Sequence, residues 1–473
     1  MLAVVSFLFC LVALVAWDRC KTPFNPITPM LLIWAVLIPF SDSELYSLNA
    51  TSGYAYTLVI SGLSAYTAGC LFGMKGGRGR FRGGDCGSFD FSQRLNRKFL
   101  YAVAFVSLAV LAYQTLQALV LLRRGYTLGM IRGMLFAYEE NEMRTSAFLV
   151  MLQKFVVTPS VALMTSLIPV ELFLVKKAER DKWLLLLASL MVVLSVLSSG
   201  GRIVIVILGM YVATALALLR RQAKTGAALR KTLSLRRKIL ITLFVFAAVF
   251  VLYRITLARK GADVDLVRQV FIYFGAPIKF LDYCVERLDT QLGQFRAYGM
   301  SSFYGFLYPL LFVWRFASGQ YPAAFLATHE YSVTMLQNSV GLGGGISINA
   351  FATMFFQPYI DAGLFGVVLV PFCYGFFAGR SYYHAFFRNS ALGLLFFFTV
   401  EYQILFSVIR FWYTQVGNAM WIVFILLGLG KPNRRKLPGR PPDPESGSVP
   451  VSFPLSGGTG HLQDRTKEGN RNP

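Results

Sequence analysis

The chain is expected to be an all-α protein that crosses a membrane about eleven times. Hydrophobic residues make up 55% of its 473 residues, and only 15% of the residues are charged. Apolar runs of about 16–24 residues recur along the chain, which is the length that an α-helix needs to cross a bilayer. Basic residues gather in alternate intervals between these runs, a pattern that orients helices in a membrane.

The first eight spans fill the N-terminal half of the chain. The run Leu2–Trp17 has no basic segment before it and no small-residue cleavage site after it, so it is expected to remain as a span rather than act as a signal peptide. Polar or basic intervals separate the next seven runs. These runs are Ile27–Phe40, Tyr54–Met74, Phe99–Leu122, Phe148–Val175, Trp183–Ser199, Ile203–Leu219 and Ile239–Leu257.

Three further spans follow a long polar interval. The first of them, Ile360–Ala378, comes after Pro358, which is expected to break the helix there. The other two, Ala391–Ile409 and Phe411–Gly430, are separated by Arg410 alone. The C-terminal bundle is therefore expected to hold about three spans.

The polar interval contains one aromatic run, at residues 301–316. This run is too short to span a bilayer comfortably, and Pro309 interrupts it. A short interfacial or re-entrant helix is expected at this place.

The spans divide the chain into four parts. These are a bundle at 1–257, a large loop at 258–349, a second bundle at 350–430 and a tail at 431–473 that is expected to be disordered. When the interval 75–98 is placed inside and the spans alternate, 31 of the 46 Lys and Arg residues fall inside and 13 outside. The N-terminus and the large loop then lie outside, and chemistry on a large polar substrate is expected under that loop.

Composition excludes several classes of function. The net charge of +23 would suit a nucleic acid, but the alternating basic intervals account for it, so no nucleic-acid partner is expected. Only Cys284 of the six cysteines lies in the outer loop, which leaves no disulfide framework there. His329, His384 and His461 stand far apart, and no Cys/His spacing resembles a metal site. Neither a metal nor a cofactor is expected.

Three outer arginines are candidate ligands for a phosphate or pyrophosphate. Arg202 ends a tight hairpin between two spans, in which Gly200 and Gly201 would let a bulky substrate approach the backbone. Arg254 lies in the last turn of its span, and Arg259 follows just beyond it. A planar guanidinium can hold a phosphate through two hydrogen bonds. The alternative role of these side chains is contact with lipid head groups.

Other ionisable groups lie within or near the late spans. Asp361, at the outer mouth of a span, could act as a general base or simply cap the helix. His329 and Glu330 in the outer loop are further candidate bases, and the alternative for His329 is an inert loop histidine. Glu401 lies in mid-span and Arg410 at the outer end of that span, too far apart to pair, so each needs a partner elsewhere. Arg410 joins the candidate pyrophosphate ligands.

Two short motifs resemble those of the Wzy-type polymerases, which are also called O-antigen or oligosaccharide repeat-unit polymerases. The Ser-Ser-Gly-Gly-Arg202 hairpin before an apolar span resembles the Gly-Gly-x-Arg-type turn of that family. The stretch 349–366, with Tyr359, Asp361 and Gly363, resembles the family's tyrosine–aspartate–glycine approach to a late span. The long outer loop before this stretch also matches the family's layout.

The resemblance implies a glycosyltransferase of the GT-C type in the bacterial inner membrane. Such enzymes move a growing glycan from undecaprenyl pyrophosphate to the non-reducing end of a new lipid-linked repeat unit, without a metal, in lipopolysaccharide biosynthesis. A chain-length regulator and a flippase are the protein partners that it implies. For this reaction Arg202, Arg254 and Arg259 would neutralise the leaving pyrophosphate, and one of the candidate bases would take the acceptor proton.

Two other functions stay open. An O-antigen ligase would transfer the glycan to a lipid core, and His329 could be its base. A flippase or transporter of lipid-linked sugars would have matching broken helices in two halves, whereas one break, near Pro358, is expected. A purely structural scaffold would leave no reason to keep Arg254 and Glu401 in lipid.

Overall fold

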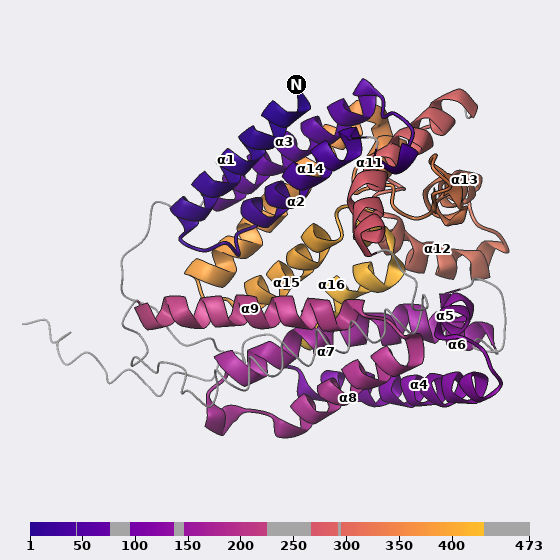
Figure 1. The fold of residues 1–473 in the computed structure, drawn as a ribbon. Coiled ribbons are helices and arrows are strands. Elements are labelled where there is room, and N and C mark those ends of the chain that lie inside the picture. Colours follow the sequence, from indigo (N-terminus) through magenta and orange to yellow (C-terminus); the bar gives the residue numbers. More distant parts are fainter. Residues whose placement is uncertain (44, 76–94, 137–145, 225–265, 292–294, 430–473) are drawn as a thin grey trace, which may run out of the picture. The chain divides into compact units, whose positions relative to one another are not determined.

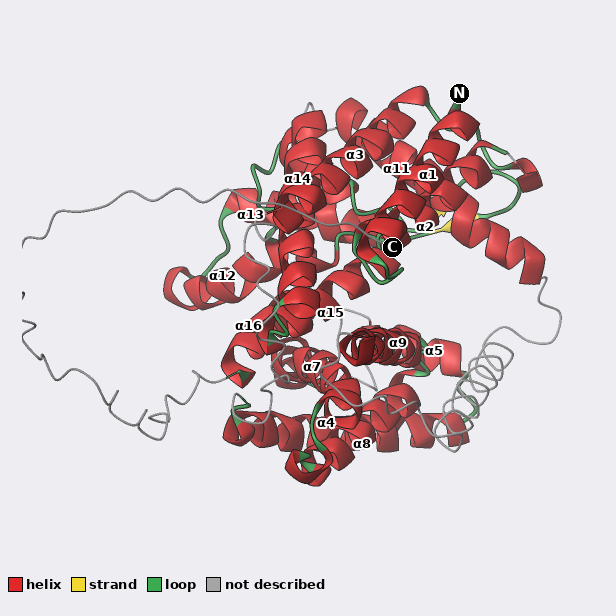
Figure 2. Ribbon diagram, turned by 90° about the vertical axis from the view of Figure 1, so that its left-hand side faces the viewer, coloured by secondary structure: helices red, strands yellow, loops and turns green. Residues whose placement is uncertain are grey.

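The computed structural model describes residues 1–473 except 44, 76–94, 137–145, 225–265, 292–294 and 430–473. The described residues are mostly helical, and their one small sheet pairs β1 (Val340–Gly341) with β2 (Ser347–Ile348) in antiparallel fashion (Figure 2). Seven helical runs in this part of the chain are long and apolar enough to cross a bilayer, and three shorter apolar helices accompany them. The predicted all-α, multi-pass membrane fold is confirmed.

The N-terminal helices follow the predicted spans to within a few residues. One of the runs, 147–174, is a continuous helix that contains two π-helical turns. The eighth predicted span, Ile239–Leu257, lies outside the described residues. The helices are α1 (Leu2–Cys20), α2 (Ile27–Asp42), α3 (Gly53–Lys75), α4 (Arg97–Arg123), α6 (Ala147–Leu152), η2 (Gln153–Val157), α7 (Thr158–Pro169), η3 (Val170–Leu174), α8 (Lys182–Ser199) and α9 (Ile203–Lys224).

The loop between the two bundles contains short helices, as expected, and one long amphipathic helix that was not expected. That helix, α11, packs mainly on α2. The remaining helices are α5 (Leu128–Phe136), α11 (Leu266–Gln291), α12 (Tyr304–Ser318), α13 (Ala323–His329), η5 (Glu330–Thr334), η6 (Met335–Gln337), α14 (Phe356–Phe387), α15 (Ala391–Leu405), η7 (Trp412–Thr414) and α16 (Val416–Gly428), with the short turns η1 (Leu45–Ser47) and η4 (Lys177–Glu179).

Two expectations about the late spans were wrong. Pro358 lies in the first turn of α14, where a missing N–H is tolerated, and the chain instead leaves helical geometry at Ala362 and Gly363. The last two spans are separated by the whole segment 406–415 rather than by Arg410 alone. Irregular backbone inside an apolar region is stable only where protein or a wet cavity surrounds it, so this segment marks a candidate site.

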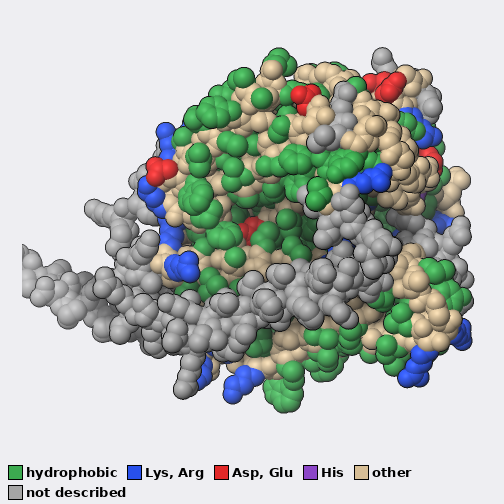
Figure 3. All heavy atoms as spheres, viewed as in Figure 1, with side chains coloured by type: hydrophobic (Ala, Val, Ile, Leu, Met, Phe, Trp, Pro, Cys, Tyr) green, Lys and Arg blue, Asp and Glu red, His purple; other side chains and the backbone are tan. Residues whose placement is uncertain are grey.

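Hydrophobic side chains cover much of the face shown in Figure 3, and Lys and Arg side chains lie mainly at its edges. Large apolar side chains such as Phe7, Phe72 and Trp183 are 66%, 56% and 70% exposed. Such a surface is expected for helices that are surrounded by lipid rather than water.

Close packing of glycines joins α3 to α14, which run side by side (Figure 1). Gly69 and Gly73 on α3 lie against the backbone of α14, and Gly375 and Gly379 on α14 lie against the backbone of α3; each pair has the four-residue spacing by which membrane helices approach closely. A Cβ added at Gly69 would lie 2.1 Å from the carbonyl oxygen of Phe372. The backbones themselves are therefore in contact at this interface.

Gly69→Ala is expected to lower the stability of the fold by about 1–3 kcal/mol, because the added methyl group must push the two backbones apart. The thermal unfolding midpoint of the purified protein measures the change. Gly209→Ala on α9 is the matched control, since nothing lies within 4 Å of a Cβ at that position. Equal midpoints for the two variants would contradict this account of the interface.

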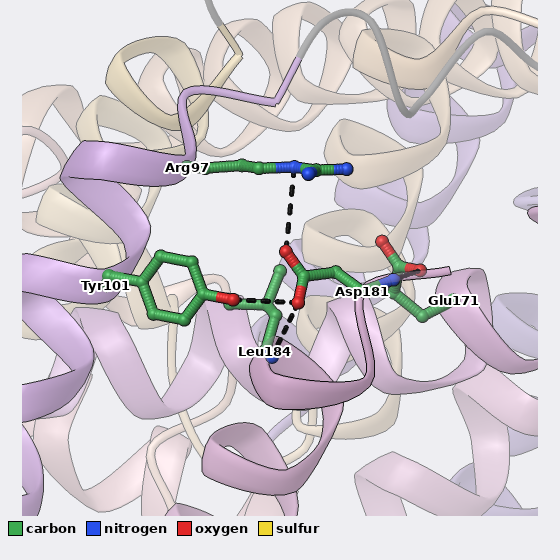
Figure 4. Close-up of polar contacts among 5 residues, drawn as sticks. All are labelled: Arg97, Tyr101, Glu171, Asp181 and Leu184. Carbon is green, nitrogen blue, oxygen red and sulfur yellow. Dashed lines mark hydrogen bonds and ion pairs between the residues drawn. The ribbon is translucent and has the colours of Figure 1, made fainter. Parts of the chain in front are cut away.

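A polar cluster ties α4 to the start of α8 at the predicted inner end (Figure 4). The Asp181 carboxylate accepts hydrogen bonds from the backbone N–H of Leu184 at 3.1 Å and from the Tyr101 hydroxyl at 2.7 Å. The Arg97 guanidinium lies 3.5 Å from the same carboxylate, and Glu171 accepts from the backbone N–H of Asp181. Asp181 thus caps α8 and holds α4 against it, which is a structural role.

Candidate functional site

A cavity of about 980 Å³ lies between α4, α5, the run 147–174, α8, α9, α12, α13 and the segment 402–418. Most of the segments that form it are those that the charge pattern places at the outer ends of their helices. Its volume is at the upper end of the usual range for a small-ligand site, so it can hold a ligand of several rings.

The lining of this cavity is cationic. Arg132, Lys154, Arg315 and Arg410 contribute to it, and none of the described lining residues is Asp or Glu. Clustered cations in a low-dielectric cavity attract anions strongly, since little water screens the charge. The cavity is therefore suited to a ligand that carries phosphate or carboxylate groups.

Two buried amides hold the backbone around Arg410. The Gln403 side chain donates to the carbonyl of Arg410 at 3.1 Å and accepts from the N–H of Trp412 at 2.7 Å. The Gln357 side chain accepts from the N–H of Phe411 at 3.2 Å. Both glutamines are fully buried. They satisfy backbone groups that the interrupted helix leaves open, and they fix the position of Arg410.

The side chain of Arg410 lies over the Trp412 ring, with its guanidinium carbon 5.7 Å from the ring centre. The backbone of Arg410 also forms an isolated parallel β-bridge with Thr353. Thr353 has a positive φ of 64°, which is costly for a β-branched residue. Strained backbone of this kind is concentrated at functional sites, where the surrounding structure enforces it.

Tyr304 on α12 and His329 at the end of α13 form a hydrogen-bonded pair in the cavity wall. The Tyr304 hydroxyl and His329 Nδ1 are 2.7 Å apart. The Tyr304 ring stacks on Phe325, with the ring centres 4.9 Å apart and the planes within 3°. Burial lowers the pKa of His329 below its ordinary value, and nearby Lys154 lowers it further while Glu330 opposes the shift. His329 is therefore neutral at neutral pH and can accept a proton.

Lys154 comes from the first π-helical turn of the run 147–174. Its ammonium group lies 5.9 Å from the centre of the Tyr308 ring, which faces it from α12. A basic residue within an apolar span is a functional candidate by its position alone. The sequence showed this signal, but it did not show that Lys154 and His329 share one cavity.

The hairpin around Arg202 borders the cavity, although Arg202 itself does not line it. Gly201 and Ile203 on either side do, and a Cβ at Gly201 would lie 3.3 Å from a terminal nitrogen of Arg132. The guanidinium that faces the cavity at this hairpin therefore belongs to Arg132 of α5, a residue that the sequence reasoning did not select. The other two predicted pyrophosphate ligands, Arg254 and Arg259, lie outside the described residues.

The predicted bases other than His329 do not line the cavity. Glu330 is exposed. Asp361 is buried, and its two carboxylate oxygens accept from the backbone N–H groups of Gly299, Ser301 and Ser302 at 2.8–3.0 Å. Asp361 therefore fastens the chain just before α12 to the second turn of α14, and these contacts favour a structural role over proton transfer.

Asp361→Asn is expected to lower stability by about 1–3 kcal/mol, because an amide replaces one of the charged acceptors and places a donor opposite a backbone N–H. The thermal unfolding midpoint measures the loss. Asp282→Asn is a suitable comparison, since Asp282 also accepts from a backbone N–H and a hydroxyl, both of Ser52, but at an exposed site. A smaller loss for Asp361→Asn than for Asp282→Asn would contradict the fastening role.

Glu401 finds its partner on another helix, as its position required. The Thr214 hydroxyl on α9 donates to one Glu401 oxygen, and both residues are buried. This contact joins α9 to α15 beside the cavity floor, where Tyr211 stacks on Phe398.

Of the residues predicted for the site, the structure thus brings two together, His329 and Arg410, and adds Arg132, Lys154 and Arg315. No family model, curated protein or solved structure matches the chain. The assignment of a function therefore depends on the chemistry of the cavity and on the resemblance of the two short motifs.

Proposed function

We propose that this protein joins undecaprenyl-pyrophosphate-linked oligosaccharide repeat units into a surface polysaccharide of the O-antigen type, at the outer face of the bacterial inner membrane. The observation that carries the proposal is the combination of a hydrogen-bonded histidine and four cationic side chains in one cavity whose described lining contains no carboxylate. Transfer from a pyrophosphate requires both a base and positive charge.

The leaving group accounts for the cations. As the bond between the anomeric carbon and the pyrophosphate breaks, its electron pair leaves with the pyrophosphate oxygen, and negative charge develops there. Arg410, held by Gln403 and Gln357, is pre-organised to stabilise that charge, and Lys154 adds to it. A fixed cation stabilises a transition state more than a mobile one, because it does not need to reorganise during the reaction.

The incoming sugar accounts for the histidine. The acceptor hydroxyl oxygen forms the new bond to the anomeric carbon and gives its proton to neutral His329. The products are a glycan longer by one repeat unit, the free lipid pyrophosphate and a protonated histidine that returns its proton to solvent. Tyrosine and tryptophan side chains in the wall, such as Tyr308, Tyr321 and Trp412, suit the faces of sugar rings.

A ligase is the second candidate, because a base and a pyrophosphate site serve that reaction equally. The two reactions differ only in the acceptor, which is a lipid-linked repeat unit for a polymerase and a lipid core for a ligase. Among the described residues that line the cavity, none distinguishes one acceptor from the other.

The deciding experiment supplies the purified protein in liposomes with the cognate lipid-linked repeat unit and, separately, with a lipid core acceptor. A glycan ladder with the repeat unit alone is expected for the polymerase. A single transfer that requires the lipid core would indicate a ligase. Movement of the lipid-linked unit across the bilayer without a new glycosidic bond would indicate a flippase and would overturn the proposal.

A further inference from the structure

Helix α12 has two chemically different faces. Tyr304, Tyr308 and Arg315 line the cavity, and they lie on one side of the helix. Leu310 and Val313 lie on the other side and are 68% and 67% exposed. One helix therefore separates the cationic cavity from an apolar surface that no described part of the chain covers.

Contacts with a spanning helix set the level of α12. The Phe155 ring packs against Tyr308 and Phe312, with ring centres 6.1 and 6.0 Å apart. Phe155 lies eight residues after Ala147, where this spanning run begins, which places it about 12 Å along the helix. The middle of α12 is therefore level with the membrane-embedded part of that run, and lipid hydrocarbon is the occupant that suits its apolar face.

Arg315 lies in the last turn of α12, on the face that lines the cavity. It lines the cavity and is exposed, and its guanidinium carbon lies 5.2 Å from the centre of the Tyr321 ring. Its neighbours Trp314 and Phe316 are exposed and apolar, at 56% and 78%. Aromatic residues beside a long cationic side chain are typical of the level of lipid head groups, where the cation meets phosphate.

The wall that α12 forms is attached to the bundle at its N-terminal end, where Gly305 lies against the backbone carbonyls of Tyr413 and Gln415. Tyr304, Phe325 and Val333 form a small hydrophobic cluster of their own, apart from the main core. Gly299, with a φ of +92°, and Gly319, with a φ of +78°, lie before and after the helix. The first turns of α12 are therefore anchored, whereas residues 313–318 at its C-terminal end are exposed.

We propose that the cavity has a side entrance beside α12. Through this entrance the phosphate-bearing head group of a lipid passes from the bilayer into the cavity. The hydrocarbon chain lies against Leu310, Val313 and Phe316, and Arg315 contacts the phosphate at the threshold. The identity of the lipid as a polyprenyl pyrophosphate rests on the proposed function, whereas the contact of α12 with hydrocarbon does not.

The contact with hydrocarbon is tested by the fluorescence of Trp314 in liposomes that contain phosphatidylcholine brominated on the part of the acyl chain next to the head group. We expect the bromolipid to quench a part of the emission that disappears in Trp314→Phe. Trp421→Phe is the control, because Trp421 is buried and its loss leaves the quenched part unchanged. Quenching of the Trp314 signal by aqueous acrylamide instead of bromolipid would place α12 in water and overturn the proposal.

The threshold role of Arg315 is tested by the rate of binding of undecaprenyl pyrophosphate, which is supplied in the bilayer and carries no glycan. Arg315→Ala is expected to slow this binding about tenfold, a change of about 1.4 kcal/mol in the barrier. Water-soluble geranyl pyrophosphate enters without the bilayer, so Arg315→Ala is expected to slow its binding much less than that of the lipid supplied in the bilayer. Arg287→Ala on α11, outside the cavity wall, is the control variant for both ligands.

Each outcome separates the entrance from the reaction. If Arg315→Ala slows the binding of both pyrophosphates equally, Arg315 is an ordinary ligand in the cavity and the entrance proposal is overturned. If it slows the binding of neither, the entrance proposal is overturned as well. Selective slowing in a protein that forms no glycan ladder would support the entrance and reject the polymerase. Arg315→Lys is expected to recover part of the rate, because it restores the charge without the planar fork.

Discussion

Replacing Arg410 with alanine is expected to reduce the rate of repeat-unit extension by a factor of about 10²–10³. The segment 406–415 interrupts two apolar helices, and Gln403 and Gln357 hold its backbone so that Arg410 lies in the cavity wall. A cation carried by backbone that is fixed in this way contributes most when charge develops on the leaving pyrophosphate. Densitometry of the glycan ladder over time measures the rate.

Two comparison variants make this prediction specific. Arg410→Lys keeps the positive charge but loses the planar fork, so it is expected to recover only part of the activity. Arg202→Ala is expected to lower the rate of repeat-unit extension less than Arg410→Ala does. Arg202 does not line the cavity, although both of its neighbours do. An unchanged ladder for Arg410→Ala, in protein with a wild-type unfolding midpoint, would remove Arg410 from the reaction.

The course of the helices was largely predictable from the sequence, because length and apolar composition suffice to identify a span. The interruption between α15 and α16 was not, since aliphatic and aromatic residues continue on both sides of Arg410. What marks it is Gln403, a fully buried amide whose partners lie in the chain beyond the helix end. A buried amide within a span indicates that it hydrogen-bonds to some other group. Its position in the sequence does not say which backbone groups those are.

The candidate site was predictable only in part, for a related reason. The Ser-Ser-Gly-Gly-Arg202 hairpin was recognised as a place where a substrate could approach, and Gly201 does line the cavity. The sequence did not reveal that Arg132, from a separate short helix, would supply the cation there. Asp361 was selected as a titratable group near a helix break, yet its oxygens are taken up by backbone N–H groups from far along the chain. Long-range partners of this kind leave no local pattern.

His329→Ala is expected to lower the rate of repeat-unit extension by a factor of about 10²–10⁴, which is the usual contribution of a positioned general base. The pyrophosphate site remains, so binding of the lipid-linked unit is expected to change much less than the rate. Tyr304→Phe keeps the stacking on Phe325 and removes only the hydrogen bond to Nδ1. Tyr304→Phe is expected to lower the rate of repeat-unit extension about tenfold, because the imidazole ring is then less well oriented.

The pH dependence separates a catalytic histidine from a merely structural one. Burial places the pKa of folded His329 below 6.5, so the neutral base is present at pH 7 and is lost as the pH falls through that lowered value. The rate is therefore expected to fall on the acid side with an apparent pKa below 6.5. In His329→Ala the rate is expected not to fall on the acid side, whereas in Asp361→Asn it is expected to fall there as in the wild type.

Stability must be followed over the same pH range, because the same titration affects folding. The unfolded chain binds a proton to His329 at a higher pH than the folded chain does, so this residue's contribution to stability is full above pH 6.5 and declines as the pH falls through the lowered pKa. If the unfolding midpoint stays above the assay temperature while the wild-type rate falls and the His329→Ala rate does not, the acid limb belongs to the reaction. A limb of the same shape in His329→Ala would assign the proton to another group and return His329 to the structural contact with Tyr304.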